Sequence, residues 1–328
     1  MTFLKTITDI FGESVLADDT STTFIPTGSL SLESAIGVPG LPRGRFTELY
    51  GPEGSAKTSL ALNFAKQNYL VSGGKTLYID AENMLDYNYA SAMAGIAIDR
   101  DYLVIVQPDT AEDAFVVAEK GIESGEFSLI VIDSVGALAP KFEKEEEFDK
   151  ASVAIIPKLL AKFLRRNVYA IKDHNIAFLF INQVRDSIGS YVKSYSTPGG
   201  HALKHFTSLI ISLTKGEQIK VGKEVVGINV NFSIRKNKLS SPFRGYTIPL
   251  VFGKGIDTYR DAINFAQTCG VVVRSGSIYK FEGEVLGRGM NDAVANLESK
   301  PETLDRIKEV VYNIGKQKPI ETEEDDDE

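Results

Sequence analysis

A stretch of nine residues early in the chain has the composition of a phosphate-binding loop. It consists of Gly51, Pro52, Glu53, Gly54, Ser55, Ala56, Lys57, Thr58 and Ser59. Residues 46–50 before it predict a strand, and residues 60–67 after it carry apolar side chains at helical spacing. Strand, glycine-rich loop, Lys-Thr and helix together form the context that a P-loop requires. Backbone N–H groups of such a loop surround phosphate oxygens, and the helix N-terminus adds partial positive charge.

Two side chains of this loop would contact the phosphates and their metal. In P-loops the lysine, here Lys57, reaches the β- and γ-phosphates, and the hydroxyl of the next residue, Thr58, ligates Mg²⁺. Ala56 departs from the pattern, which has glycine before the lysine. We expect Ala56 to be harmless if it has helical dihedrals, since only a positive φ would require glycine. Two other interpretations stay open: an ordinary turn that opens a helix, and a loop that binds nucleotide but hydrolyses it poorly.

Acidic and amide side chains follow three apolar segments that predict strands. These segments are 75–80, 128–132 and 177–181. Polar residues at the carboxyl ends of parallel strands face the ligand crevice of an α/β sheet. Asp133 therefore has the position of a Walker B aspartate, which holds Mg²⁺ directly or through water. Glu82 could polarise the attacking water, and Gln183 could sense the γ-phosphate; a helix-capping role for Glu82 stays open.

The overall composition is typical of a soluble globular protein of one or two domains. The chain has 328 residues, of which 43% are hydrophobic and 24% charged. Cys269 is the only cysteine, which excludes an intrachain disulfide and fits a reducing compartment. His174, His201 and His205 form no ligand pattern. With no apolar run of membrane-spanning length and no signal sequence, we expect a cytoplasmic protein without a membrane partner.

The net charge of −8 is distributed unevenly along the chain. Residues 321–328 hold seven of the acidic residues, so the remainder is close to neutral. A block of like charges at a terminus predicts a disordered tail. Such a tail could compete with nucleic-acid phosphates for a basic surface, or it could serve solubility alone.

We expect four regions along the chain. Residues 1–23 form a short arm, too small for a core of its own, that packs on another subunit. Residues 24–255 form an α/β core with a mostly parallel sheet, because strand and helix patterns alternate. Residues 256–318 form a small α+β unit, in which 259–267 and 302–314 predict helices and 271–274 and 277–281 predict strands, and 319–328 form the acidic tail.

The segment 184–200 is long and shows no periodicity. Loops of this length inside an α/β core are usually functional or disordered. It combines the bases Arg185 and Lys193 with the aromatic residues Tyr191 and Tyr195. Such a combination suits single-stranded nucleic acid, because the basic side chains can bind phosphates and the aromatic rings can stack on bases.

Several motifs in combination resemble those of the bacterial RecA recombinases, nearly from end to end. The matching segments are 26–32, 40–45, 51–53, 79–82, 107–110, 131–135, 180–185, 199–204 and 236–238. The resemblance implies a RecA-type P-loop ATPase core with a short N-terminal arm and a small C-terminal α+β domain. It implies a recombinase that uses ATP and Mg²⁺ to coat single-stranded DNA as a helical filament. The filament would exchange strands with homologous duplex DNA in recombination and repair, and DNA-dependent ATP hydrolysis would control its turnover.

The resemblance also implies roles for residues around the nucleotide. Asp86 and Tyr89 match the residues that contact and stack on adenine. Gln183 matches the amide that links the γ-phosphate to a DNA-binding loop. Lys236 and Lys238 match the lysines that reach the ATP of the neighbouring subunit, as an arginine finger does in trans. Head-to-tail contacts that do not close then produce a filament, with self-association mediated by nucleotide.

The family's two DNA-binding loops would fall near 143–152 and at 184–200. The DNA-binding positions implied in and around them are Lys158, Arg165, Arg185, Tyr191, Lys193, Gly199 and Gly200. Single-strand-binding and mediator proteins are possible further partners.

Some features depart from the family pattern. Ala56 replaces glycine, the N-terminal arm is shorter, and the first DNA loop is more acidic and lacks the usual glycines. His205 stands where the family has an aromatic residue that couples subunits. These departures indicate a divergent member, and its origin, bacterial or phage, stays open. Two alternatives to an active recombinase remain: a DNA-binding filament protein with weak or lost ATP hydrolysis, and a related ring-forming ATPase such as a hexameric helicase.

Overall fold

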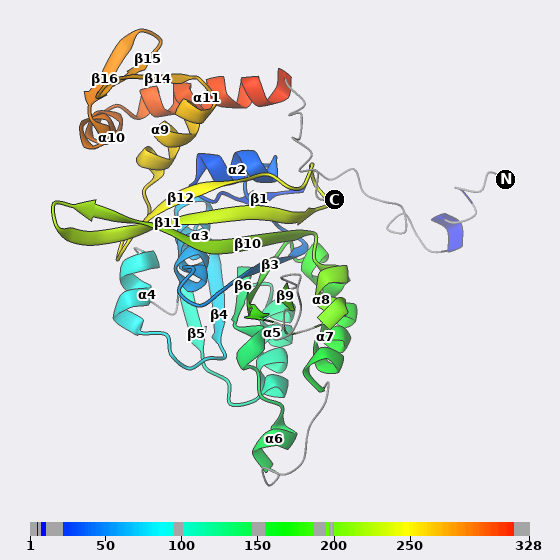
Figure 1. Cartoon of the computed structure of the whole chain (residues 1–328). Helices are drawn as coiled ribbons and strands as arrows, with labels where there is room; N and C mark the ends of the chain where they lie inside the picture. The colour runs from blue at the N-terminus through cyan, green and yellow to red at the C-terminus, as the bar shows by residue number, and fades with distance from the viewer. Residues whose placement is uncertain are drawn as a thin grey trace, which may run out of the picture.

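A mixed sheet forms the centre of the molecule (Figure 1). The computed structural model describes residues 5, 8–10, 22–94, 101–145, 155–186, 195, 196, 198 and 200–317. Within them the sheet consists of β3 (Arg45–Gly51), β4 (Lys75–Asp80), β5 (Leu103–Val106), β6 (Phe127–Asp133), β7 (Ala177–Gln183), β10 (Leu209–Val221), β11 (Glu224–Asn237), β12 (Gly245–Val251) and β13 (Gly255–Ile256). Their spatial order is β13-β12-β11-β10-β3-β7-β6-β4-β5.

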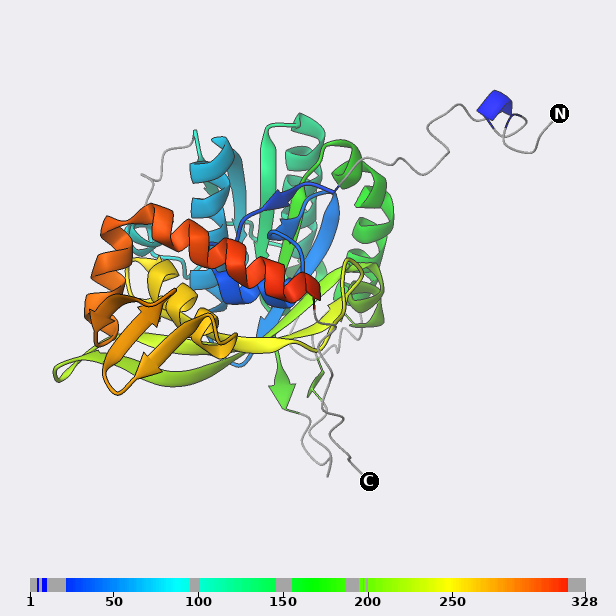
Figure 2. The same ribbon diagram turned by 90° about the horizontal axis from the view of Figure 1, so that it is seen from above.

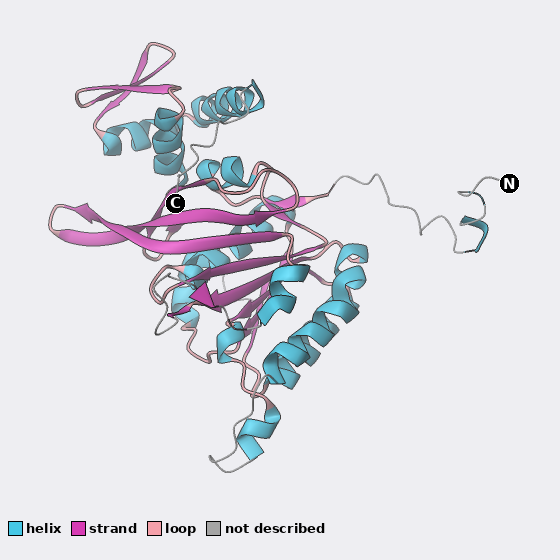
Figure 3. Ribbon diagram, turned by 45° about the vertical axis from the view of Figure 1, so that its right-hand side comes forward, coloured by secondary structure: helices cyan, strands magenta, loops and turns pink. Residues whose placement is uncertain are grey.

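The sheet is parallel from β10 to β5 and antiparallel from β10 to β13. This confirms the prediction of a mostly parallel sheet. The central parallel strands β6 and β7 have nearly continuous apolar sequences because both of their faces are covered. The hairpin of β10 and β11 extends beyond the body of the sheet (Figure 3). Because the parallel strands all point the same way, their carboxyl ends lie at one edge of the sheet.

Helices cover both faces of the parallel part. One face carries α2 (Leu30–Ile36), α3 (Lys57–Ser72) and α4 (Tyr87–Ala94); the other carries α5 (Ala111–Ser124), α7 (Ile155–Asp173) and α8 (Gly200–Phe206). The alternation of side chains along β7 shows the division. Leu179 packs in the same cluster as Leu60 of α3, whereas Phe178 and Phe180 pack with Phe163 of α7. The core therefore consists of two apolar layers with the sheet between them.

The C-terminal unit contains helices and a separate antiparallel sheet. Its elements are α9 (Thr258–Thr268), β14 (Val272–Ser275), β15 (Ile278–Phe281), β16 (Glu284–Arg288), α10 (Met290–Ser299) and α11 (Pro301–Gln317). The sequence predicted α9, β14, β15 and α11, but not β16 and α10. Both missed elements have weak local signals: β16 is short and contains Gly287, and α10 starts after Gly289 without a side-chain cap.

Short elements complete the described chain. They are β1 (Phe24–Ile25), β2 (Leu41–Pro42), the 3-10 turn η2 (Val135–Ala137), α6 (Lys141–Glu145), β8 (Arg185–Asp186) and β9 (Tyr195–Ser196). The segment predicted as an irregular loop thus begins and ends in a short antiparallel pair, β8 with β9. Most of the predicted arm and the whole acidic tail lie outside the described residues. None of the helices described is long and apolar enough to cross a membrane.

The C-terminal unit is attached to the core through α2, which α9 and α11 both contact (Figure 2). Ser29 caps α2, because its side-chain oxygen accepts from the N–H of Leu32. Its hydroxyl also donates to Asp261 of α9 at 3.0 Å, and the backbone N–H of Ser31 donates to the same carboxylate at 3.1 Å. Leu30 packs into the apolar core of the C-terminal unit. The N-terminus of α2 therefore holds this unit, together with β12, where Tyr246 packs against Phe265 of α9.

The buried carboxyl of Asp261 predicts a pH-dependent stability. Burial raises its pKa to about 6, and the bonds from Ser31 and Ser29 only partly oppose this. Because the folded pKa lies above the unfolded one, the folded state binds the proton more tightly, and stability falls as pH rises from about 4 to about 6. Asp261→Asn removes this titration, so between pH 4 and pH 7 the unfolding free energy of the wild type should fall by about 2.5 kcal/mol relative to that of the variant. Urea unfolding of both proteins across this range measures the difference, and a pH-independent difference would contradict it.

Candidate nucleotide-binding site

The phosphate-binding loop joins β3 to α3, as the sequence predicted. Gly51 ends β3, and α3 begins at Lys57. A Cβ at Gly51 would lie 2.3 Å from the carbonyl oxygen of Leu213 in β10, so only glycine allows the two strands to approach. Gly54 has a φ of +70°, a conformation in which glycine is unstrained. At both positions the backbone geometry therefore explains why the residue is glycine, in addition to the motif.

Ala56 is the N-cap of α3 and has left-handed dihedrals, with φ 65° and ψ 28°. We expected Ala56 to be harmless if its dihedrals were those of a right-handed helix, and the observed dihedrals do not meet this condition. The left-handed conformation costs a residue with a Cβ about 1–2 kcal/mol. The loop therefore keeps the backbone shape that glycine would give it, with local strain at Ala56.

Lys57 lies inside the loop. Its Nζ donates to the carbonyl oxygens of Gly51 at 3.0 Å and Pro52 at 2.8 Å. Burial lowers the pKa of Lys57, and the carboxylates of Asp133 and Glu82, among others, partly offset this. The ammonium group is thus held at the phosphate-binding loop, where its positive charge suits an anionic ligand.

Thr58 and Asp133 meet beside the loop. The Thr58 hydroxyl donates to Oδ2 of Asp133 at 2.7 Å, and the Tyr78 hydroxyl donates to the same oxygen at 2.6 Å. Burial raises the pKa of Asp133 to about 6, although both hydrogen bonds act in the opposite direction. Sequence reasoning identified Thr58 and Asp133 but missed Tyr78, whose only signal was a hydroxyl-bearing ring within an apolar strand.

These oxygen atoms fit a magnesium ion. Mg²⁺ binds hard oxygen ligands and usually needs only one or two carboxylates, because phosphates and water complete its shell. A hydroxyl and a carboxylate in contact, next to the phosphate loop, match that requirement. Among the described residues there is no cluster of three His, Cys, Asp or Glu side chains that would suit a metal bound by protein alone.

Glu82 connects the ends of three strands. It follows β4, and its Oε1 accepts from the amide of Gln183 at 2.8 Å and from the hydroxyl of Ser134 at 2.7 Å. Gln183 ends β7, and Ser134 follows β6. In these contacts Glu82 caps no helix, and its role toward the attacking water stays a prediction. Sequence reasoning missed Ser134, although its position directly after Asp133 is a usable signal.

The residues expected at the adenine lie beside the first turns of α3. Tyr89 of α4 shares a 2.6 Å hydrogen bond between its hydroxyl and that of Ser59. The backbone N–H of Tyr89 donates to Asp86 at 2.7 Å. Asp80 orders the segment between β4 and α4, which contains Asp86, because Oδ2 of Asp80 accepts from the N–H of Leu85 at 3.1 Å. The three predicted nucleotide-binding residues Ser59, Asp86 and Tyr89 are therefore neighbours, and the contact of Asp86 and Tyr89 with adenine stays a prediction.

Asn182 links β3 to the end of the predicted DNA loop. Its amide donates to Glu48 of β3 at 3.0 Å and to the carbonyl oxygen of Pro198 at 2.7 Å. Glu48 is buried, and burial raises its pKa. The two amides at the end of β7 thus have different partners: Gln183 contacts the acidic residue of the site, and Asn182 contacts the loop.

Lys236 lies at the end of β11, and β10 separates it from β3. Its Nζ donates to the carbonyl oxygens of Lys204 at 2.5 Å and His205 at 3.2 Å, at the C-terminal end of α8. Lys238 is exposed. Their predicted contact with ATP concerns a second subunit and stays a prediction.

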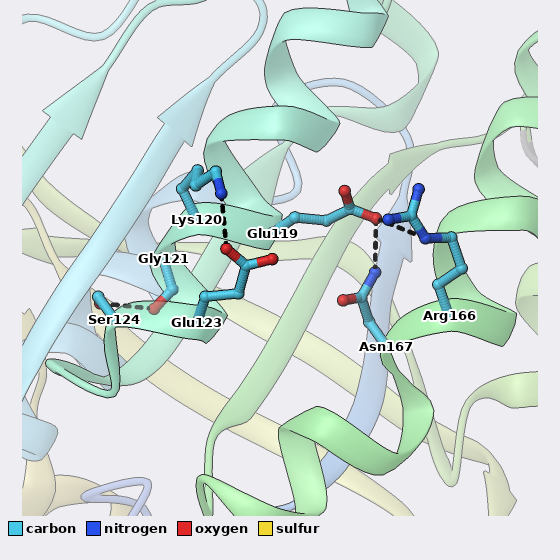
Figure 4. A network of polar contacts seen from close by, with 7 residues as sticks. All are labelled: Glu119, Lys120, Gly121, Glu123, Ser124, Arg166 and Asn167. Carbon is cyan, nitrogen blue, oxygen red and sulfur yellow. Dashed lines mark hydrogen bonds and ion pairs between the residues drawn. The ribbon is translucent and has the colours of Figure 1, made fainter.

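The predicted DNA-binding residues are described only in part. Lys158 and Arg165 are exposed on α7, Gly200 opens α8 with a φ of +65°, and Arg185 lies in β8. The neighbouring Arg166 differs from Arg165, because its guanidinium pairs with Glu119 of α5 at 3.5 Å (Figure 4). Three further predicted residues lie outside the described part of the chain: Tyr191, Lys193 and Gly199.

The loop between β3 and α3, with Lys57 and Thr58 at the start of α3 and Asp133 at the end of β6, defines a P-loop nucleotide-binding protein. The chain belongs to the RecA family, which confirms the resemblance seen in the sequence. The model of the RecA N-terminal domain matches residues 2–257, and that of the RecA C-terminal domain matches residues 260–314. This family consists of P-loop ATPases.

Individual relatives agree with this assignment. The chain is 39% identical over 312 residues to Protein RecA of Thermus aquaticus, covering 93% of this chain and 91% of the relative. It is 37% identical over 314 residues to Protein RecA of Acholeplasma laidlawii, covering 94% of each. Among solved structures, the RadB recombinase matches with a TM-score of 0.54 and 23% identity, over 71% of this chain and 98% of that chain. This last similarity concerns the fold.

The strain at Ala56 predicts that glycine stabilises the protein. Ala56→Gly removes the left-handed penalty, and the greater freedom of glycine in the unfolded chain offsets part of the gain, leaving a net stabilisation of up to about 1 kcal/mol. Denaturant unfolding measures this change. Ala161→Gly, in the right-handed interior of α7, is the matched control and should lose about 1 kcal/mol. If Ala56→Gly lowered the free energy of unfolding as much as Ala161→Gly does, Ala56 would be unstrained.

Proposed function

We propose that this protein is an ATP-dependent DNA recombinase. It assembles on single-stranded DNA as a helical filament, pairs that strand with a homologous duplex and exchanges strands, with DNA-dependent ATP hydrolysis controlling filament turnover. The observation that carries the proposal is the convergence of Lys57, Thr58, Asp133 and Glu82 at the phosphate loop of a RecA-family chain. The relatives named Protein RecA, matched over nearly their whole length, support the same function.

The residues divide the chemistry of hydrolysis between them. Lys57 and the N–H groups of the loop bind the phosphates, and Thr58 and Asp133 hold Mg²⁺. When bound, the ion neutralises charge that develops on the transferred phosphoryl group. Glu82 accepts a proton from the attacking water. Both hydrogen bonds between Glu82 and other described residues fall on Oε1, so Oε2 is the oxygen that can serve as the base.

The end of β7 couples the nucleotide to DNA. Gln183 contacts Glu82, and the predicted DNA loop starts at the next residue. Asn182 contacts Pro198, near the end of that loop. If Gln183 moved on ATP binding, the start of the predicted DNA loop would move with it. Asn182 would keep the far end of that loop attached to β3.

The filament would place ATP between subunits. In that assembly Lys236 and Lys238 reach the nucleotide bound by Lys57 of the neighbour, so nucleotide stabilises the active form. Residues 1–23 contribute a further subunit contact. The partners are single-stranded and duplex DNA, other copies of the chain, and single-strand-binding and mediator proteins, all in the cytoplasm.

The first experiment measures ATP hydrolysis with and without single-stranded DNA. We expect strong stimulation by DNA in the wild type and a loss of roughly 100-fold or more in Lys57→Ala, because the phosphates lose their buried cation. Lys66→Ala, on the same helix but outside the loop, is the matched control and should keep the wild-type rate. DNA binding without hydrolysis in the wild type would favour a filament protein that has lost its ATPase activity. A wild type that neither binds single-stranded DNA nor hydrolyses ATP would contradict the proposal.

Adjacent arginines on α7 test the DNA-binding surface. Arg165 is exposed and has no ion pair with a described residue, whereas Arg166 is paired with Glu119. Arg165→Ala should weaken binding to single-stranded DNA and reduce the slope of log K against log salt by about 0.7, one phosphate contact. Arg166→Ala should change the slope less. Equal slopes in the wild type and in Arg165→Ala would exclude direct phosphate contact by Arg165.

A further inference from the structure

Tyr78 is a core residue whose hydroxyl enters the nucleotide site. It lies in the middle of β4, opposite Val131 of β6 and Ile105 of β5, and its side chain is fully buried in the same apolar cluster as Leu60. Neighbouring strands and helix α3 therefore fix the ring. Its hydroxyl reaches the end of β6 and donates to Oδ2 of Asp133 at 2.6 Å.

We propose that Tyr78 is a positioning residue of the nucleotide site: its hydroxyl holds the Asp133 carboxylate in the orientation that binds Mg²⁺. This inference rests on the proposed function, because it gives a role to a residue beside the same metal site. Nothing in the P-loop or Walker B patterns requires a hydroxyl at this place in β4.

The distribution of hydrogen bonds on Asp133 supports this role. Thr58 and Tyr78 both donate to Oδ2, and Oδ1 takes neither bond. Thr58 has two functions, since the same hydroxyl would ligate the metal. The buried ring places the Tyr78 hydroxyl, and this hydroxyl has no metal-ligating role, so it is the donor that can hold Asp133 whether or not Thr58 is engaged.

The chemistry of the pair fits a permanent donor. Burial raises the pKa of Tyr78 well above its ordinary value, and the charge of Asp133 adds to this, so the phenol keeps its proton at neutral pH. A carboxylate buried among apolar strands needs hydrogen-bond donors to stay charged and fixed. Outer partners of this kind typically change metal affinity by about 10–100-fold when they are removed.

The test compares Tyr78→Phe with a matched control. Phenylalanine keeps the buried ring and removes only the hydroxyl. Tyr279→Phe removes the hydroxyl of another buried tyrosine, in β15 of the C-terminal unit. Equilibrium binding of a fluorescent ATP analogue is followed while Mg²⁺ is titrated, and again in EDTA. This readout does not depend on hydrolysis.

We expect Tyr78→Phe to need about tenfold more Mg²⁺ for half-maximal effect, with nucleotide affinity in EDTA unchanged. Tyr279→Phe should match the wild type in both measurements. An unchanged Mg²⁺ midpoint in Tyr78→Phe would overturn the role of Tyr78 while leaving the proposed function intact. A wild type without Mg²⁺-dependent nucleotide binding would instead overturn the proposed function, and the role of Tyr78 with it.

A second variant covers the case in which Tyr78→Phe does not fold. Replacing Tyr78 by 3,5-difluorotyrosine keeps the ring and the hydroxyl and makes the phenol a stronger donor. The Mg²⁺ midpoint should then fall below that of the wild type. A midpoint equal to or above the wild-type value would overturn the proposal.

Discussion

The hydrogen bond between Thr58 and Asp133 is the contact on which the site depends. It joins the first turn of α3 to the end of β6, although β7 lies between β3 and β6 in the sheet. The parallel arrangement makes this possible, because the carboxyl ends of β3, β6 and β7 reach the same edge. The phosphate loop, the acid after β6 and the amides after β7 thereby become parts of one site.

Three buried or half-buried carboxylates of this protein accept hydrogen bonds from neutral donors. Asp133 accepts from two hydroxyls, Glu82 from an amide and a hydroxyl, and Asp261 from serine hydroxyls and a backbone N–H. Neutral donors orient a carboxylate without cancelling its charge. At Asp133 the remaining charge is available to a metal ion; at Asp261, remote from the phosphate loop, the same kind of arrangement attaches the C-terminal unit to α2.

Much of the site could be predicted from local sequence because its signals are local. The glycines, Lys57 and Thr58 are consecutive, and Glu82, Asp133 and Gln183 each follow an apolar strand segment. Prediction from the sequence failed where the local signal was weak or where the partner of a residue lies far away in the chain. Short β16 and uncapped α10 were missed, and Ala56 has a backbone conformation that its side chain does not indicate. Ser134 became visible as a partner of Glu82 only through the packing of β4 against β6.

The sequence by itself determined the fold class, the phosphate loop and the family, because periodicity, glycine positions and motif order are properties of neighbouring residues. The tertiary structure alone decided which side chains meet. Tyr78 looks like an ordinary core aromatic in sequence, yet the register between β4 and β6 brings its hydroxyl to Asp133, 55 residues further along the chain. Glu48 and Asn182, separated by 134 residues, become partners in the same way. Such contacts depend on strand order and register, which long-range packing sets and no local pattern encodes.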